Sequence, residues 1–227
     1  MAITLQGVVP FGRSLDVYRR IFDLSDRDIE RKIIGVGDGP SSFNAEMRKI
    51  GKHVTSVDPL YEFTAEEIGG RFNVVLDGVI DQVKASVNGY VWTYYKSADD
   101  LRRQRMEAME IFLRDYADGL REGRYVKGAL PRLGFGDREF DIALCSHFLF
   151  LYSEHFDHAF HRDSVYEMLR VAHEARIFPL IDLKLRPSPY VELIIDELER
   201  DGYCAEIKKV DYEVQRGGNM MMRIYRA

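Results

Sequence analysis

Residues Lys32 to Tyr61 read KIIGVGDGPSSFNAEMRKIGKHVTSVDPLY, and this stretch decides the fold. An apolar run at 32–36 leads into three closely spaced glycines, Gly35, Gly37 and Gly39, as a buried parallel strand does when it enters a tight turn. Glycine tolerates positive φ and lets a ligand approach the backbone, and the first N–H groups of a following helix attract polar or anionic groups. The stretch therefore predicts a strand, a ligand-binding loop and a helix.

A second strand is expected at residues 53–57, and it ends in Asp58. Asp58 follows Gly37 by 21 residues, about where a nucleotide-binding sheet places a carboxylate against the ribose hydroxyls. The two strands are interpreted as the front of a Rossmann-like sheet. The alternative is a glycine-rich turn that only packs a helix on the sheet.

The loop Gly37-Asp38-Gly39-Pro40-Ser41 resembles the cofactor loop of class I S-adenosylmethionine-dependent methyltransferases. Pro40 stands where the dinucleotide fingerprint has its third glycine, which favours a methyltransferase over an NAD(P)-binding oxidoreductase, the alternative kept open. The resemblance implies that S-adenosyl-L-methionine (SAM) is the cofactor. It places the loop against the methionine end of SAM and Asp58 on its ribose.

The resemblance continues through most of the chain. The segment GALPRLGFGDREFDIALCSHFLFLY, from Gly128, resembles the passage from the third strand to the fourth, with the fourth expected at 140–145. A helix and a fifth strand at 175–183 follow, and two strands at 204–214 and 219–225 resemble the antiparallel hairpin that this family adds to its sheet. The implied fold is α/β, a Rossmann-like class I methyltransferase sheet that is mostly parallel, with a C-terminal antiparallel hairpin and a helical insertion after the second strand.

The resemblance also implies the residues of the site. A helix capped by Ser14 is expected over the cleft, where Arg13 or Tyr18 would reach the methionine carboxylate. The expected cofactor-binding residues are Arg13, Tyr18, Gly35, Gly37, Asp38, Gly39, Asp58, Pro59, Ala129, Leu130, Cys145 and Ser146. His147, just after the fourth strand, is the candidate general base, and a histidine that merely packs on the cofactor is the alternative.

Two positions depart from the family pattern. Gly35 and Ala129 stand where relatives commonly carry acidic residues. These departures keep open a second function, a non-catalytic SAM-binding or interaction protein with the same fold.

The third strand is expected only at 124–130, so residues 64–123 form an insertion. Capping boxes at Thr64 and Ser97 begin two helices, with an aromatic run at 90–95 between them. We expect one domain over residues 1–227, in which the insertion is a helical cap that sets substrate choice. The competing interpretation is that the apolar face of the second helix forms a dimer.

Two charged clusters were weighed as ligand sites. Arg102, Arg103 and Arg105 share their helix with several acidic residues, so they are interpreted as a solvated face and not as an anion site. The histidines of residues 155–161 are spaced at i, i+3 and i+6, which drifts around a helix and does not match the zinc pattern. No metal site is predicted.

The composition limits the partners. With 227 residues, a net charge of −5 and a pI near 5.7, the chain lacks the basic character of a broad nucleic-acid binder, so a small-molecule substrate is expected. No run approaches the roughly 20 apolar residues of a membrane helix. Two cysteines and no apolar leader favour a cytoplasmic location, as a monomer or homodimer.

Overall fold

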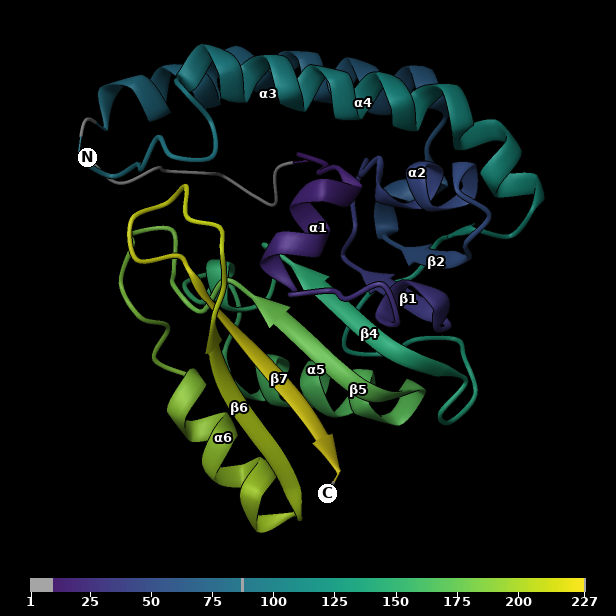
Figure 1. Cartoon of the computed structure of the whole chain (residues 1–227), viewed down its shortest axis with the longest axis vertical. Helices are drawn as coiled ribbons and strands as arrows, with labels where there is room; N and C mark the ends of the chain where they lie inside the picture. Colours follow the sequence, from purple (N-terminus) through teal and green to yellow (C-terminus); the bar gives the residue numbers. More distant parts are fainter. Residues whose placement is uncertain (1–9, 87, 227) are drawn as a thin grey trace.

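The computed structural model describes residues 10–86 and 88–226. Within them, seven strands form one sheet (Figure 1). The strands are β1 (Ile33–Val36), β2 (Val54–Val57), β3 (Tyr125–Val126), β4 (Phe140–Ser146), β5 (Ala172–Phe178), β6 (Tyr203–Lys209) and β7 (Met220–Arg226). The helices are α1 (Leu15–Ile21), α2 (Phe43–Lys49), α3 (Ala65–Ala85), α4 (Ala98–Arg121), α5 (His158–Val171) and α6 (Val191–Arg200). Three short 3-10 helices are η1 (Asp28–Glu30), η2 (Pro59–Glu62) and η3 (Phe150–Tyr152).

The order of the strands defines the fold. It runs β3-β2-β1-β4-β5-β7-β6, in which β1 to β5 pair in parallel and β7 lies antiparallel between β5 and β6. This is the class I methyltransferase sheet, so the predicted fold class is confirmed. The chain leaves β1 towards β2 on one side and returns to β4 on the other, and open α/β sheets bind ligands at such a reversal, outside the carboxyl ends of the strands.

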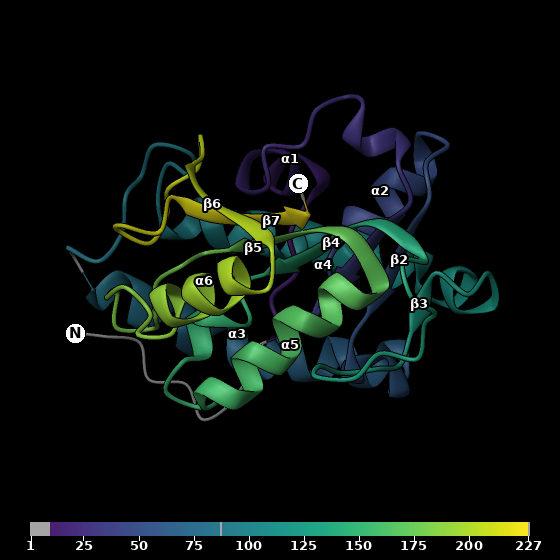
Figure 2. The same cartoon turned by 90° about the horizontal axis from the view of Figure 1, so that it is seen from below.

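Alternating residues of the strands pack into two hydrophobic layers, one on each face of the sheet, because successive side chains of a strand point to opposite faces. Ile33 and Ile142 pack with α1, α2 and the α3–α4 pair, whereas Ile34 and Ala143 pack with α5 and α6. Figure 2 shows α5 and α6 together on one side of the sheet. The sheet is therefore covered on both faces.

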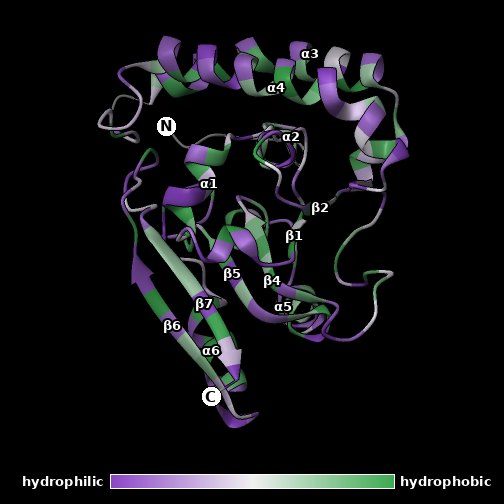
Figure 3. Ribbon diagram, turned by 45° about the vertical axis from the view of Figure 1, so that its right-hand side comes forward, coloured by the Kyte–Doolittle hydropathy of each residue, from purple (hydrophilic) through white to green (hydrophobic). Residues whose placement is uncertain are grey.

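The two long helices of the insertion lie side by side across the top of the molecule in Figure 1. Thr64 and Glu67 form the predicted capping box of α3, and the Ser97 side chain caps α4 by accepting from the N–H of Asp100. Hydrophobic residues recur on the face that the pair turns towards the rest of the chain (Figure 3), and Phe72 and Phe112 are buried in the same layer as Ile33. This apolar face of the two helices is thus packed against the rest of the same chain.

Three predicted strands have different bounds. The fifth strand was predicted at 175–183 but begins at Ala172, directly after α5, and ends before Pro179, which has no N–H to donate to the sheet. The third strand pairs only at Tyr125–Val126, at the sheet edge. The hairpin strand predicted to reach 214 ends at Lys209, and the residues beyond it form a longer connection to β7.

Within the described residues, no helix combines the length and the apolar character needed to cross a bilayer.

Candidate functional site

A cavity of about 490 Å³ opens at the carboxyl ends of β1, β2 and β4. It is bounded by the loops that follow these strands, the turn after β3, the start of α3 and the segment before α1. The predicted site residues that line it are Arg13, Tyr18, Gly37, Asp38, Gly39, Asp58, Pro59, Ala129, Leu130, Ser146 and His147. Gly35 and Cys145 lie outside the lining, and Cys145 is buried in the α5–α6 layer, where burial raises the pKa of its thiol to about 12.

The loop after β1 needs its glycines. Gly37 and Gly39 have φ of 65° and 55°, in the left-handed region that side chains disfavour. Gly39 is held from both sides, because its N–H donates to Asp58 Oδ2 at 2.8 Å and its carbonyl accepts from the Tyr61 hydroxyl at 2.6 Å. The loop is therefore fixed in one shape at the cavity wall.

Asp58 caps the turn after β2. Its Oδ1 accepts from the N–H of Leu60 at 2.8 Å, while Oδ2 accepts from Gly39. Burial raises the pKa of this carboxyl. A carboxylate offers about four acceptor positions, so these two bonds leave capacity for ribose hydroxyls.

The carboxylate of Asp38 fills the space beside Gly35. A Cβ atom on Gly35 would lie 2.2 Å from Asp38 Oδ2, so any side chain at Gly35 would displace this carboxylate. The Tyr18 hydroxyl donates to Asp38 Oδ1, and the Ser56 hydroxyl donates to Oδ2 at 2.6 Å. Burial is the largest cause that raises the pKa of Asp38 to about 6. A carboxylate thus lies beside Gly35 at the cavity wall, and Tyr18 holds it there.

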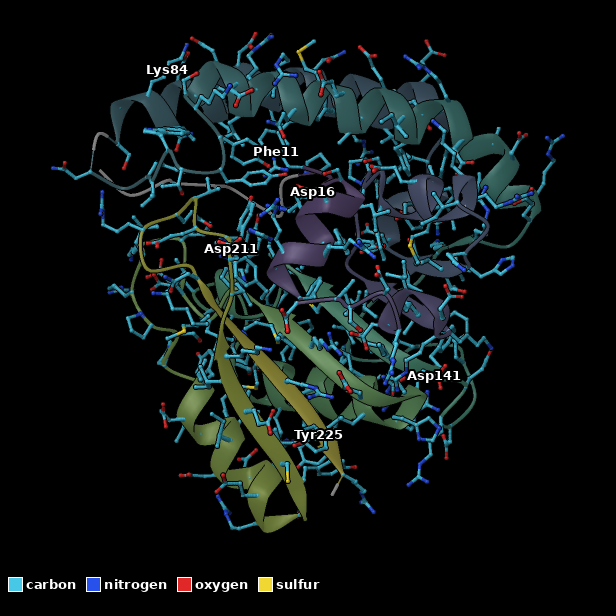
Figure 4. The ribbon with its side chains drawn as sticks, in the orientation of Figure 1. Phe11, Asp16, Lys84, Asp141, Asp211 and Tyr225 are labelled. Carbon is cyan, nitrogen blue, oxygen red and sulfur yellow. The ribbon has the colours of Figure 1, made fainter. Side chains whose placement is uncertain are left out.

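The segment before α1 is fastened to the glycine loop. Gly12 packs so closely that a Cβ there would lie 1.9 Å from the Pro40 carbonyl oxygen. The Ser41 hydroxyl accepts from the Arg13 N–H at 3.0 Å and donates to the Arg13 carbonyl at 2.6 Å. Figure 4 shows Phe11 of this segment between α1 and the α3–α4 pair, where its ring meets that of Phe72 at 5.5 Å.

The guanidinium of Arg13 has few hydrogen-bond partners among the described residues. One guanidinium nitrogen donates to the Phe11 carbonyl at 2.9 Å, whereas the buried Nε has no partner among the described residues. Burial, and then the nearby charge of Arg105, lower the pKa of Arg13 to about 10. A guanidinium whose hydrogen-bond donors are not all paired is suited to a carboxylate.

His147 follows β4 with a φ of 52°, which is unusual for a residue with a side chain. Its backbone N–H donates to the Phe178 carbonyl at 2.6 Å, and its Nδ1 lies 3.0 Å from the Ser146 hydroxyl. Burial, followed by the charges of Arg13 and Arg105, holds the pKa of the imidazole well below 6.5. The ring is therefore neutral and held in place at the cavity wall.

A second cavity, of about 110 Å³, adjoins the first. Phe11, Arg13 and His147 line both, so the two cavities meet at these side chains. The rest of the second cavity is lined by α3, α4, the loop between them, η3, Leu183 after β5 and the connection from β6 to β7.

Arg105 lines this second cavity and is only 5% exposed. The prediction of a solvated face is confirmed for Arg102 and Arg103, whose side chains are 38% and 59% exposed, and is wrong for Arg105. The spacing in the sequence does indicate that Arg105 faces inward, because it is four residues from both Leu101 and Met109, on the buried stripe of α4.

The sequence also missed residues that the insertion contributes to the first cavity. Arg71 and Val75 of α3 line it, and the Arg71 guanidinium lies 3.6 Å from the centre of the Phe63 ring. Nothing in the spacing of Phe63 and Arg71 marks them as cavity residues. In the aromatic run at 90–95, Tyr95 is fully buried and Trp92, which is 36% exposed, lines neither cavity.

The histidine-rich segment does not gather a metal site. His161 is buried, with its two ring nitrogens 2.8 Å from the carbonyl oxygens of Asp157 and Leu149. Among residues 10–86 and 88–226, no group of three or more His, Cys, Asp or Glu side chains is placed to hold a metal ion.

The fold and the cavity define a class I methyltransferase-type α/β protein. In sequence, the chain is 34% identical over 225 residues to the uncharacterized protein MJ0045 of Methanocaldococcus jannaschii, and the match covers 99% of both chains. The chain therefore belongs to the family of this archaeal protein. No family model matches it.

Two solved structures are distantly similar. Magnesium protoporphyrin IX methyltransferase from Synechocystis PCC 6803, with bound SAM, overlaps with a TM-score of 0.45 at 13% identity, over 86% of this chain and 69% of its own. The MMP1179 protein of Methanococcus maripaludis overlaps with a TM-score of 0.49 at 13% identity, over 94% of this chain and 83% of its own. The strand order of the chain itself, rather than these overlaps, defines the fold.

Proposed function

We propose that the chain is a SAM-dependent methyltransferase that acts on a small-molecule nucleophile. The observation that carries the proposal is the placement of three charged side chains, Asp38, Asp58 and Arg13, around one cavity at the carboxyl ends of the parallel strands. SAM has three matching groups, an ammonium, a ribose diol and a carboxylate.

Each group of the cofactor has a partner of suitable chemistry. Asp38 accepts from the methionine ammonium, Arg13 donates to the methionine carboxylate, and Asp58 accepts from the ribose hydroxyls. Ala129 offers no carboxylate to adenine, so the Leu130 backbone is the contact proposed there. The volume of about 490 Å³ is within the usual range of small-molecule sites.

Methyl transfer depends more on the alignment of the acceptor with the methyl group and sulfur of SAM than on strong acid–base groups. The nucleophile of the acceptor attacks the methyl carbon, the bond from carbon to sulfur breaks, and its electron pair stays on sulfur as S-adenosylhomocysteine (SAH) forms. Holding the reactants in line supplies most of the catalysis. His147, at the junction of the two cavities, is the proposed base for an acceptor that must lose a proton.

We infer that the insertion belongs to one domain with the sheet and serves as its cap. Its helices contribute Arg71 to the first cavity and Val79, Val83 and Leu101 to the second. Because cap residues line the second cavity, which the acceptor would enter, the insertion is placed to choose the substrate.

A non-catalytic SAM-binding protein is the second candidate. One observation favours it: the low pKa of His147 makes the unliganded imidazole a weak base. Bound anions would offset the nearby arginine charges and raise that pKa, so the enzyme remains our proposal.

A crystal structure with SAH tests both candidates. The enzyme requires the SAH sulfur to face His147 and the second cavity. A sulfur that faces closed core would leave only the binding function, and SAH bound away from Asp38 and Asp58 would contradict the site itself.

A further inference from the structure

Two arginines of the second cavity lack an anionic partner. Arg105, which is 5% exposed, donates to the Gly12 carbonyl at 3.1 Å, and Arg13 donates to the carbonyl of the adjacent Phe11 at 2.9 Å. Neither guanidinium forms an ion pair among the residues that the structure describes.

Burying such a pair of like charges is unfavourable. A buried ion loses favourable hydration that an opposite charge must offset, and the repulsion between two cations adds to this cost. The Tyr95 ring, whose centre lies 5.5 Å from the Arg105 guanidinium carbon, the Tyr212 hydroxyl and the Gly12 carbonyl supply dipoles but no negative charge. An anion bound between the arginines would supply it.

The methionine carboxylate of the cofactor would not balance the charges of both arginines. Arg13 lines both cavities and is the partner proposed for that carboxylate, whereas Arg105 lines only the second cavity. One carboxylate balances one guanidinium, so a second positive charge remains, and it faces the cavity that the cofactor does not fill.

We propose that the second cavity binds the anionic group of the methyl acceptor, a carboxylate or a phosphate, with Arg105 as its main partner. This inference rests on the proposed methyltransferase function. Arg105 presents a fork of donors that suits either oxyanion, and with the anion held there the acceptor nucleophile lies towards His147, where the cavities meet.

The other side chains that line the second cavity indicate the chemical character of the rest of the acceptor. They are mostly apolar or aromatic, with Val79, Val83, Leu101, Tyr90 and Val214 among them, and Gln215 is polar. The volume of about 110 Å³ corresponds to roughly four water molecules of liquid. The acceptor is therefore a small apolar or aromatic acid, or a larger molecule that inserts such an end.

Three probes of similar shape test the inference on the full chain saturated with SAH: benzoate, phenyl phosphate and neutral benzamide. Calorimetry should show one site for benzoate or phenyl phosphate, and the tighter of the two identifies the oxyanion. Benzamide should bind at least about tenfold more weakly, as expected for the loss of a charge-assisted hydrogen bond. Equal affinities for the charged and neutral probes would overturn the inference.

Variants assign the effect to Arg105. Arg105→Met should lower the affinity for the preferred anion at least about tenfold and leave the affinity for SAH unchanged. Arg102→Met, on the exposed face of the same helix, should bind the anion as tightly as the parent chain does. Unchanged anion binding in a folded Arg105→Met chain would refute the assignment. If Arg105→Met does not fold, the comparison of benzoate with benzamide on the parent chain decides. Absent SAH binding would defeat the proposed function separately, and the same comparison on the unliganded chain would then decide whether the anion site exists.

Discussion

A Cβ atom on Gly35 would lie 2.2 Å from Oδ2 of Asp38, so the glycine makes room for the carboxylate three residues later. The sequence pattern showed only that an acid was missing at Gly35. The folded loop returns a carboxylate to the same space, where the Tyr18 and Ser56 hydroxyls hold it at the cavity wall.

The first prediction concerns this carboxylate. Asp38→Asn should weaken SAH binding at least about tenfold at pH 8, because the methionine ammonium loses a charge-assisted hydrogen bond. Asp81→Asn, which makes the same charge change on the exposed side of α3, is the matched control. Equal SAH affinities in the two variants, measured by calorimetry, would remove Asp38 from the cofactor site.

The second prediction is a pH dependence of binding. Burial, and to a smaller extent the charge of Asp58, raise the pKa of Asp38 to about 6, although the hydrogen bonds from the Ser56 and Tyr18 hydroxyls act to lower it. Above that pH the carboxylate is ionised and attracts the ammonium, and below it the carboxyl is neutral. SAH affinity should therefore fall as the pH drops from 8 to 5, and this decrease should be smaller in Asp38→Asn. Identical profiles would contradict the prediction.

The third prediction follows from the same shift, without ligand. A carboxyl whose folded pKa lies above its unfolded value of 3.8 favours folding below that value, and this contribution is lost as the pH rises through about 6. The cost to the free energy of unfolding at pH 8 is at most about 3 kcal/mol, at 1.36 kcal/mol per pH unit. Asp38→Asn should accordingly gain stability relative to the parent between pH 5 and pH 8 in urea unfolding. A constant difference across that range would show that Asp38 does not titrate as described.

The fourth prediction separates two roles of Asp58. Asp58→Ala should weaken SAH binding at least about tenfold and lower stability by about 1 kcal/mol, because the turn after β2 loses its cap. Tyr61→Phe removes the other hold on Gly39 without touching the carboxylate, so it measures the effect of loosening the loop. If Tyr61→Phe weakens the binding of SAH as much as Asp58→Ala does, the proposed role of Asp58 at the ribose is refuted.

The fifth prediction concerns His147. Once an acceptor is known, His147→Ala should lower turnover by about 10²- to 10⁴-fold if that acceptor loses its proton in the reaction, with SAH affinity retained. Because its pKa in the unliganded chain lies well below 6.5, His147 itself should cause no inflection in kcat/KM between pH 7 and 9. Unchanged turnover in the variant would exclude His147 from the mechanism.

Local patterns predicted much of the fold. The apolar strand at Ile33–Val36, the helix capped by Ser14 and the capping box at Thr64 all form where their residues indicate, because each depends on neighbours in sequence. The start of β5 was missed because α5 passes directly into the strand at Ala172, without a turn residue to mark the change.

The site was predictable only in part. Gly37 and Asp58 are found from spacing, since strand ends in a parallel sheet meet at one edge. The position of the Asp38 carboxylate beside Gly35 depends on how the loop folds back, and the proximity of Arg13 to Arg105 joins residues 92 positions apart. No local pattern carries such contacts, although the buried stripe of α4 does mark Arg105 as inward-facing.

Calorimetry of the intact chain with SAM, SAH, NAD and NADP tests the central proposal most directly. We predict binding of SAM and SAH at one site per chain, weakened by Asp38→Asn, and no comparable binding of NAD or NADP. Heat from NAD or NADP, with none from SAM or SAH, would contradict the methyltransferase and replace it with an oxidoreductase.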